Sequence, residues 1–189
     1  MEDRVDRIIE EWRQRRPDLD FSPLEVVSRI LRAAHFLQAR LDEIASAYGL
    51  SHTGDLEVLT NLDRAGPPYE RTPSELAAAQ LVTPGGMTVR LNRLQRAGLV
   101  ERRPNPRDGR GVLVRLTPVG RELAADALGT LIEAQGAGVA GLEASERSEL
   151  AGLLRDLLAT LGDIPAFRPV NVAPASGAEA GEPSKSPGL

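Results

Sequence analysis

Hydrophobic residues along this chain recur mainly at intervals of three and four, which is the spacing of one face of a helix. Near the N-terminus, Val5, Ile8, Ile9 and Trp12 follow this spacing, and Pro17 ends the pattern. The pattern predicts a mainly helical protein. The predicted helices cover about residues 3–16, 24–48, 52–65, 73–80, 84–97, 118–135 and 144–161.

Four short motifs predict where helices begin. Ser22-Pro23-Leu24-Glu25 and Thr72-Pro73-Ser74-Glu75 have the pattern of a capping box with Pro at the first helical position. Thr83-Pro84 and Thr117-Pro118 open two further helices with a threonine cap and a proline. Glycines at 136, 138 and 141 are poor helix formers, so they suggest a break after the helix 118–135.

The helices 24–48 and 144–161 each carry a long apolar stripe. Hydrophobic residues make up 41% of the chain and aromatic residues 3%, so the core is expected to be aliphatic. The stripe of the first helix consists of Val27, Leu31, Ala34, Leu37, Leu41 and Ile44. The residues of the second helix that are expected to face inward are Leu150, Leu153, Leu154, Leu157, Leu158 and Leu161.

Residues 72–117 contain the pattern that is most informative about the fold. Helices at 73–80 and 84–97 are followed by two short β patterns, at 99–103 and 111–116, and an Arg-rich loop joins the two strands. Helix, turn, helix and β-hairpin is the order of a winged helix-turn-helix. We therefore expect a mainly α protein with a small β-hairpin wing, flanked by N- and C-terminal helices.

Composition divides the chain at about residue 161. We expect residues 1–161 to form one folded domain. Residues 162–189 contain five Pro, four Gly and few core-forming side chains, so we expect a disordered C-terminal tail there.

The predicted winged-helix segment is basic, whereas the chain as a whole is acidic. Residues 72–117 hold eight arginines and three acidic residues, a net charge of +5. The whole chain has a net charge of −4, so the other residues carry −9. A basic module inside an acidic protein is typical of a site for a polyanion such as nucleic acid.

Several functional classes find little support in the sequence. The chain has no cysteine and two histidines, His35 and His52, which fall on different helical segments, and it contains none of the common catalytic or phosphate-binding motifs. We therefore expect no enzyme activity, no metal site and no cofactor. No stretch is apolar enough to cross a membrane, and the charged N-terminus is unlike a signal peptide, so we expect a cytoplasmic protein.

The helix 84–97 has two chemically different faces. Met87, Leu91 and Leu94 should face the core, and polar and small groups should face outward. In a major groove, Asn reads adenine, Arg reads guanine and a methyl group meets thymine. Gly85 and Gly86 would let backbone N–H groups approach a phosphate, or would simply form a turn. The outward residues expected to contact DNA are Thr88, Val89, Asn92, Arg93 and Arg96.

The loop between the strands places arginines at the tip of the predicted wing. Arg107 and Arg110 flank Asp108-Gly109, and Asp108 has the chemistry to hold the turn. An arginine at such a tip is suited to a narrow minor groove, where the potential is most negative. Outside a winged-helix pattern, the same group of charged residues would be interpreted as an ordinary solvent-exposed surface.

The run LAAAQLVTPGGMTVRLNRLQRAGLVERRPNPRDGRGVLVRLTPVGREL resembles the MarR family of bacterial transcription regulators. The resemblance covers about residues 1–161 and implies a DNA-binding and dimerisation domain whose DNA-binding lobe is about 52–117. It implies a homodimer built by the helices 24–48 and 118–161, which represses transcription at a duplex operator until a small ligand binds. By position, Thr88, Val89 and Asn92 match groove-facing residues and Arg110 matches a minor-groove arginine.

The N-terminal helix resembles an extension found in the urate-responsive branch of that family. The branch uses a Trp in this helix, an acid early in the third helix, an Arg in the recognition helix and an Arg in the first wing strand. The matching residues are Trp12, Glu57, Arg90 and Arg102, which implies a small anionic aromatic ligand such as urate or a related purine. Glu57 departs from the branch, which typically carries Asp. Two simpler interpretations stay open. Trp12 could be an ordinary core residue, and Glu57 and Arg90 could form an ordinary ion pair.

A different class of function also fits a winged helix, namely a protein-interaction module that has lost sequence-specific DNA binding. Such modules tend to lose the basic wing tip, whereas this chain keeps Arg107 and Arg110. The sequence therefore favours DNA binding.

Overall fold

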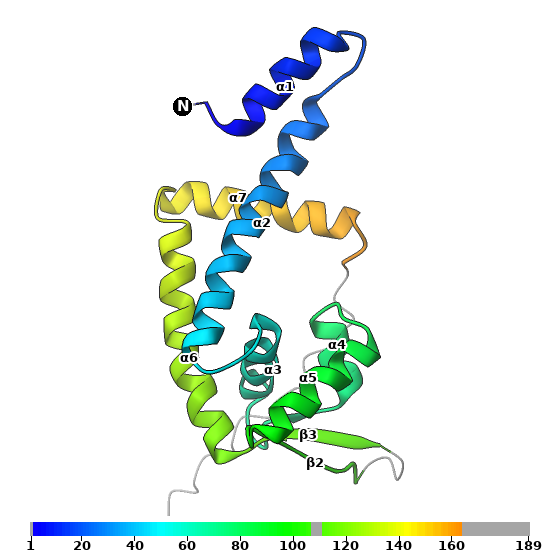
Figure 1. The fold of residues 1–189 in the computed structure, drawn as a ribbon, viewed down its shortest axis with the longest axis vertical. Coiled ribbons are helices and arrows are strands. Elements are labelled where there is room, and N and C mark those ends of the chain that lie inside the picture. The colour runs from blue at the N-terminus through cyan, green and yellow to red at the C-terminus, as the bar shows by residue number, and fades with distance from the viewer. Residues whose placement is uncertain (1, 107–110, 164–189) are drawn as a thin grey trace, which may run out of the picture. The chain divides into compact units, whose positions relative to one another are not determined.

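The chain is mainly helical with one small antiparallel sheet, as the sequence predicts (Figure 1). The computed structural model describes residues 2–106 and 111–163. Two compact units are present, Met1–Gly141 and a second that begins at Leu142. The elements are α1 (Arg4–Arg15), α2 (Ser22–Ala47), α3 (Thr53–Arg64), β1 (Glu70–Arg71), α4 (Pro73–Ala79), α5 (Pro84–Arg96), β2 (Val100–Pro104), β3 (Val112–Leu116), α6 (Pro118–Gly138) and α7 (Ala144–Thr160).

Helix α1 packs against α2, and its contact differs from the predicted one at two residues, Ile8, which is 39% exposed, and Trp12. Val5 and Ile9 are buried, whereas Trp12 from the same stripe is 47% exposed. The capping box predicted at Ser22 is wrong. Both the backbone N–H and the hydroxyl of Ser22 donate to Asp20, at 2.9 Å each, so this side chain does not cap α2.

Three threonines begin helices in the DNA-binding lobe, as predicted. The hydroxyl oxygen of Thr72 accepts from the N–H three residues later at 3.2 Å, that of Thr83 does so at 3.2 Å and that of Thr117 at 3.0 Å. These caps satisfy backbone donors at helix starts. The predicted break in the glycine-rich segment lies after Gly138, three residues later than expected.

The sheet has three strands in the order β1-β3-β2, all antiparallel. Strands β2 and β3 form the predicted wing, with Val100 opposite Leu116 and Pro104 opposite Val112. Strand β1 was not predicted, because two residues cannot show a periodic pattern. Pairing with β1 covers one edge of β3, so the base of the wing is fixed to the segment before α4.

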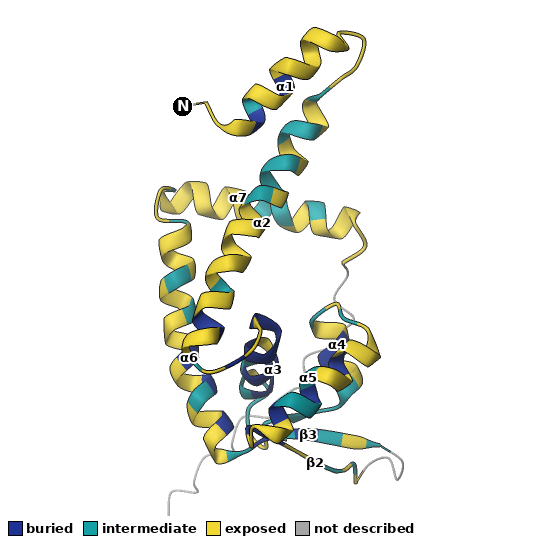
Figure 2. Cartoon of the chain, viewed as in Figure 1, coloured by how far each residue is buried: buried dark blue, intermediate teal, exposed yellow. Residues whose placement is uncertain are grey.

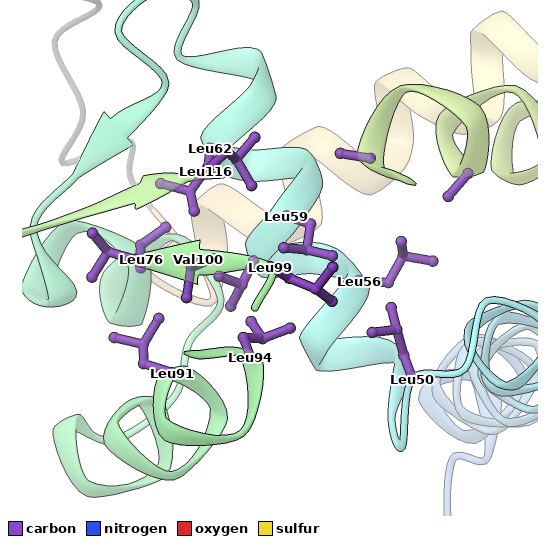
Figure 3. Close-up of a cluster of buried hydrophobic side chains, with 14 of the residues drawn as sticks. Leu50, Leu56, Leu59, Leu62, Leu76, Leu91, Leu94, Leu99, Val100 and Leu116 are labelled. Atoms are coloured by element: carbon purple, nitrogen blue, oxygen red, sulfur yellow. The ribbon is translucent and has the colours of Figure 1, made fainter. Parts of the chain in front are cut away.

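The core of the first unit is aliphatic and lies where α3, α4 and α5 meet the sheet (Figure 3). Met87, Leu91 and Leu94 of α5 are at most 1% exposed, which confirms their predicted inward orientation. They pack with leucines of α3 and α4 and with Val100 and Leu116 of the wing strands. Burial of this stripe fixes which face of α5 points outward.

The apolar stripes of α2 and α7 are largely exposed in a single chain (Figure 2). The prediction that the stripe of α7 faces inward is therefore wrong within the described part of one chain. Burial in α2 is confined to its C-terminal end, at Ile44 and Ala45, and the described residues of α7 include no buried one. The exposed stripe residues are Val27, Leu31, Ala34 and Leu37 in α2 and Leu150, Leu153, Leu158 and Leu161 in α7.

Candidate nucleic-acid interface

Helix α5 presents polar and small side chains on the face opposite its buried stripe. Thr88, Val89 and Arg96 are exposed and Asn92 is half-buried. Val89 keeps 59% of its surface in water although it is apolar, so nothing in the described part of the chain covers this part of the helix. The face combines methyl, amide and guanidinium groups, the three chemistries that read base edges in a major groove.

The start of α5 is open to an approaching phosphate. Gly85 and Gly86 are exposed, and a Cβ built on Gly85 would meet nothing within 4 Å. A Cβ on Gly86 would meet the Thr83 hydroxyl oxygen at 3.3 Å. The fold therefore does not require glycine at 85. Gly85 and Gly86 lie in the first turn of α5 and do not form a separate turn, and their backbone is open to close approach by another molecule.

Arg93, predicted to contact DNA, forms a bidentate ion pair inside the protein. Its Nε and Nη2 donate to the two carboxylate oxygens of Asp55 at 2.6 Å each. Asp55, in the first turn of α3, is 1% exposed, and it raises the pKa of the Arg93 guanidinium above its ordinary value. The pair joins α3 to α5, so Arg93 acts within the fold. Sequence reasoning missed Asp55, because an acid in the first turn of a helix usually just favours the helix dipole.

Arg102 of β2 also contacts α5. Its Nη1 donates to the side-chain oxygen of Asn92 at 2.9 Å and to that of Gln95 at 2.7 Å. Arg103, the next residue, pairs with Glu70 of β1 at 3.4 Å on the other side of the strand. The wing strand thus connects to the recognition helix through one arginine and to the rest of the sheet through the other.

The predicted minor-groove arginines, Arg107 and Arg110, lie outside the described residues. On either side of them, the backbone N–H of Asn105 donates to the carbonyl of Gly111 at 2.9 Å, which closes the hairpin.

Glu57 and Arg90, two members of the predicted ligand set, lie close together. Their charged atoms are 3.8 Å apart, a long ion pair, and burial raises the pKa of Glu57 although Arg90 opposes the shift. Arg90 bonds more closely to the side-chain oxygen of Gln80, at 2.5 Å. It lies flat against Gly54, where an added Cβ would be 2.2 Å from the guanidinium carbon. Sequence reasoning missed both Gln80 and Gly54.

A cavity of about 590 Å³ opens beside Glu57. It lies between α3 and the end of α4, with Leu128 of α6 at its rim. Gln80 lines the cavity as well and links it to Arg90. The cavity is large enough for a small heterocycle.

The other two members of the predicted ligand set do not join Glu57 and Arg90. Trp12 stacks on Phe21, with ring centroids 6.4 Å apart, and Arg102 bonds to α5 as described above. Helix α1 packs along the first part of α2, whereas α3 follows the far end of α2 (Figure 1). A helix of 26 residues is about 39 Å long, so Trp12 is remote from Glu57 within one chain.

Comparison with known proteins agrees with this geometry. The sequence model of the MarR family matches residues 48–111. The HTH-type transcriptional regulator PecS of Dickeya dadantii is 36% identical over 116 residues, which are 61% of this chain and 69% of that protein. The chain belongs to the MarR family. It is therefore a winged-helix transcriptional regulator and not an enzyme.

Solved structures of the same family share the fold. The MarR-family regulator Sco5413 of Streptomyces coelicolor is 30% identical with a TM-score of 0.66, and the match covers 77% of this chain and 99% of that one. A cysteine-to-serine mutant of MarR from E. coli, complexed with operator DNA, is also 30% identical, with a TM-score of 0.63. That match covers 73% of this chain and 97% of the other.

Residues 2–106 and 111–163 hold no cluster of His, Cys, Asp or Glu with the geometry of a metal site. Within the same ranges, no helix has the length and apolar character needed to cross a membrane.

Proposed function

We propose that this regulator binds a pseudo-palindromic duplex operator as a homodimer and represses transcription there. The observation that carries the proposal is the outward face of α5. The opposite face of the helix is buried in the core, whereas Thr88, Val89 and Arg96 are exposed and Asn92 is half-buried. This face belongs to a segment with a net charge of +5 in an acidic chain. Arg107 and Arg110 of the wing would add minor-groove contacts.

The exposed apolar stripes support homodimerisation. In α2, Leu31 is 65% exposed and Val27 49%, and in α7 Leu153 is 62% exposed. Large apolar patches of this kind mark protein interfaces, and obligate homodimer interfaces resemble a divided core. We propose that residues 1–161 form the functional dimerising module and that residues 162–189 are a dispensable tail.

Base reading by α5 is tested with Asn92→Ala. The variant should lose about 1–3 kcal/mol of discrimination at one position of each half-site. The assay is a binding competition among duplexes that differ at single positions. Arg110→Ala serves as a contrast, because a wing arginine reads groove shape and its loss should weaken binding to all sequences. An equal loss on every duplex for Asn92→Ala would show that α5 does not read bases.

A second part of the proposal is relief of repression by a small anionic aromatic ligand, with urate or a related purine as first candidates. Glu57 and Arg90 are the proposed ligand residues that lie together, and Trp12 and Arg102 are proposed as further members, although they lie apart from this pair within one chain. The nearness of Glu57 to Arg90 and the adjoining cavity support the first two. Because Arg90 lies on α5, a ligand that draws it from Gln80 would disturb the recognition helix. To weaken DNA binding 100-fold, the ligand must bind the DNA-free protein about 2.7 kcal/mol more tightly than the DNA-bound protein.

The ligand proposal is tested by titrating a preformed protein–DNA complex with urate, xanthine and hypoxanthine. DNA release and the fluorescence of Trp12, the only tryptophan, are followed together. Glu57→Asp restores the acid typical of the urate-responsive branch and should sharpen the response to urate. If millimolar purines neither quench Trp12 nor release DNA, the purine part of the proposal fails and the regulator part stands.

A further inference from the structure

Arg102 joins the wing to the base-reading face of α5 by an unusual contact. One nitrogen, Nη1, donates to the amide oxygens of both Asn92 and Gln95, at 2.9 and 2.7 Å. A guanidinium Nη carries two hydrogens, so one hydrogen serves each amide. Arg102 is exposed and lies outside the buried core, so the contact is not a by-product of core packing.

The chemistry of arginine decides which end of each amide faces the wing. Arginine has five N–H donors and no acceptor, so the atom turned toward it must be the oxygen. The amide NH₂ groups of Asn92 and Gln95 are therefore directed away from Arg102. Without this anchor, the terminal amide torsion of either side chain would have a broad, nearly two-fold preference.

Amide orientation matters for reading bases. An NH₂ group donates to guanine N7 and O6 and to thymine O4, whereas bidentate recognition of adenine needs the amide oxygen and NH₂ together. When the oxygens of both amides are engaged by Arg102, the NH₂ groups remain as the available donors. The anchored amides should then favour guanine, which presents two neighbouring acceptors, over adenine, which presents one acceptor beside a donor.

We propose that Arg102 is a positioning residue for operator recognition, which fixes the amides of Asn92 and Gln95 and thereby sets their base preference. This inference rests on the proposed DNA-binding function, and it assigns specificity to a wing residue that need not touch a base. It differs from a phosphate contact, which would add affinity on any sequence.

The proposal is tested with Arg102→Ala and Arg102→Lys on a set of operator duplexes, each with one base pair changed. At the position that Asn92 reads, Arg102→Ala should reduce the ratio of guanine to adenine affinity about tenfold. Arg102→Lys keeps a single charged nitrogen with enough N–H donors for both amide oxygens, so it should retain more of the preference than Arg102→Ala. Because Arg102 is exposed, both variants should fold, which circular dichroism checks.

Arg103→Ala is the matched control. It removes the same charge from the neighbouring position of β2, but Arg103 pairs with Glu70 and does not contact α5 amides in any bond that the described residues show. Its base preference should equal that of the wild type. A second control is Arg102→Ala combined with Asn92→Ala, which should show no further loss of preference at the Asn92 position.

Two results would overturn the inference. One is a loss of affinity that is equal on all duplexes and accompanied by a salt slope lower by about one, since that is the behaviour of a phosphate contact. The other is an unchanged base preference in Arg102→Ala. Absence of any sequence preference in the wild type would instead refute the proposed function itself.

Discussion

The ion pair between Asp55 and Arg93 offers the sharpest quantitative prediction. Asp55 is 1% exposed and accepts two hydrogen bonds of 2.6 Å, whereas the Arg93 side chain is 31% exposed. Removal of one partner from a buried pair costs about 3–5 kcal/mol, because the remaining charge is left in a low-dielectric site. The two partners differ in how much water they could recruit, so the two single variants should differ.

Asp55→Asn should destabilise the protein by about 2–3 kcal/mol. This loss is smaller than that expected for a fully buried pair, because solvent reaches the Arg93 guanidinium that is left without its partner. Arg93→Met should cost about 3–5 kcal/mol, because it leaves a fully buried carboxylate without its counter-charge. In the double variant no buried charge is left unpaired, so its loss should be well below the sum of the two single losses.

Urea unfolding of the wild type, both single variants and the double variant gives the coupling energy. Protomer concentration must be held fixed, since unfolding of a dimer depends on it. A coupling energy below about 0.5 kcal/mol, the value typical of surface pairs, would refute the reasoning.

Operator binding by Asp55→Asn is a further check. Its affinity should fall while its salt slope stays the same, because Arg93 is engaged inside the protein.

Three further predictions follow from other parts of the chain. Gly120→Ala should lower the melting temperature, because the new Cβ would lie 1.9 Å from the Leu99 carbonyl oxygen, and the overpacking cost of about 1–3 kcal/mol exceeds the helix gain of about 1 kcal/mol. Gly129→Ala in the same helix, with nothing within 4 Å, should raise it. Glu57→Gln should gain stability relative to the wild type as the pH rises above about 4.5. Burial raises the pKa of Glu57 above 4.5, so its protonated form stabilises the fold at low pH and this is lost as the pH rises through the folded pKa. Removal of residues 164–189 should leave the melting temperature and operator affinity unchanged, and a shift of several degrees would contradict that.

The sequence allows the local structure to be predicted well, because local chemistry decides it. Thr72, Thr83 and Thr117 each cap a helix with a hydrogen bond to an amide three residues away, and the buried stripe of α5 repeats within one helix. The exception at Ser22 has the same origin. A competing acceptor, Asp20, lies only two residues upstream.

Contacts between distant residues could not be predicted in this way. The Asp55–Arg93 pair and the Arg102 contact with Asn92 join residues 38 and 10 positions apart, and no periodic pattern marks such partners. These contacts change the site, since Arg93 turns inward and Arg102 joins the recognition face. The apolar stripe of α2 was identified correctly as a pattern, but its burial depends on surfaces that one chain does not supply.

The central claim, sequence-specific operator binding by a dimer, is tested most directly by a salt titration with the protein's own upstream DNA. Fluorescence anisotropy would compare this duplex with a scrambled one of equal length, and light scattering would count protomers per duplex. The account predicts two protomers on a site whose half-site centres are about 10 base pairs apart, with affinity falling steeply as salt rises. Binding that is equal on both duplexes, insensitive to salt, or made by a monomer would contradict it.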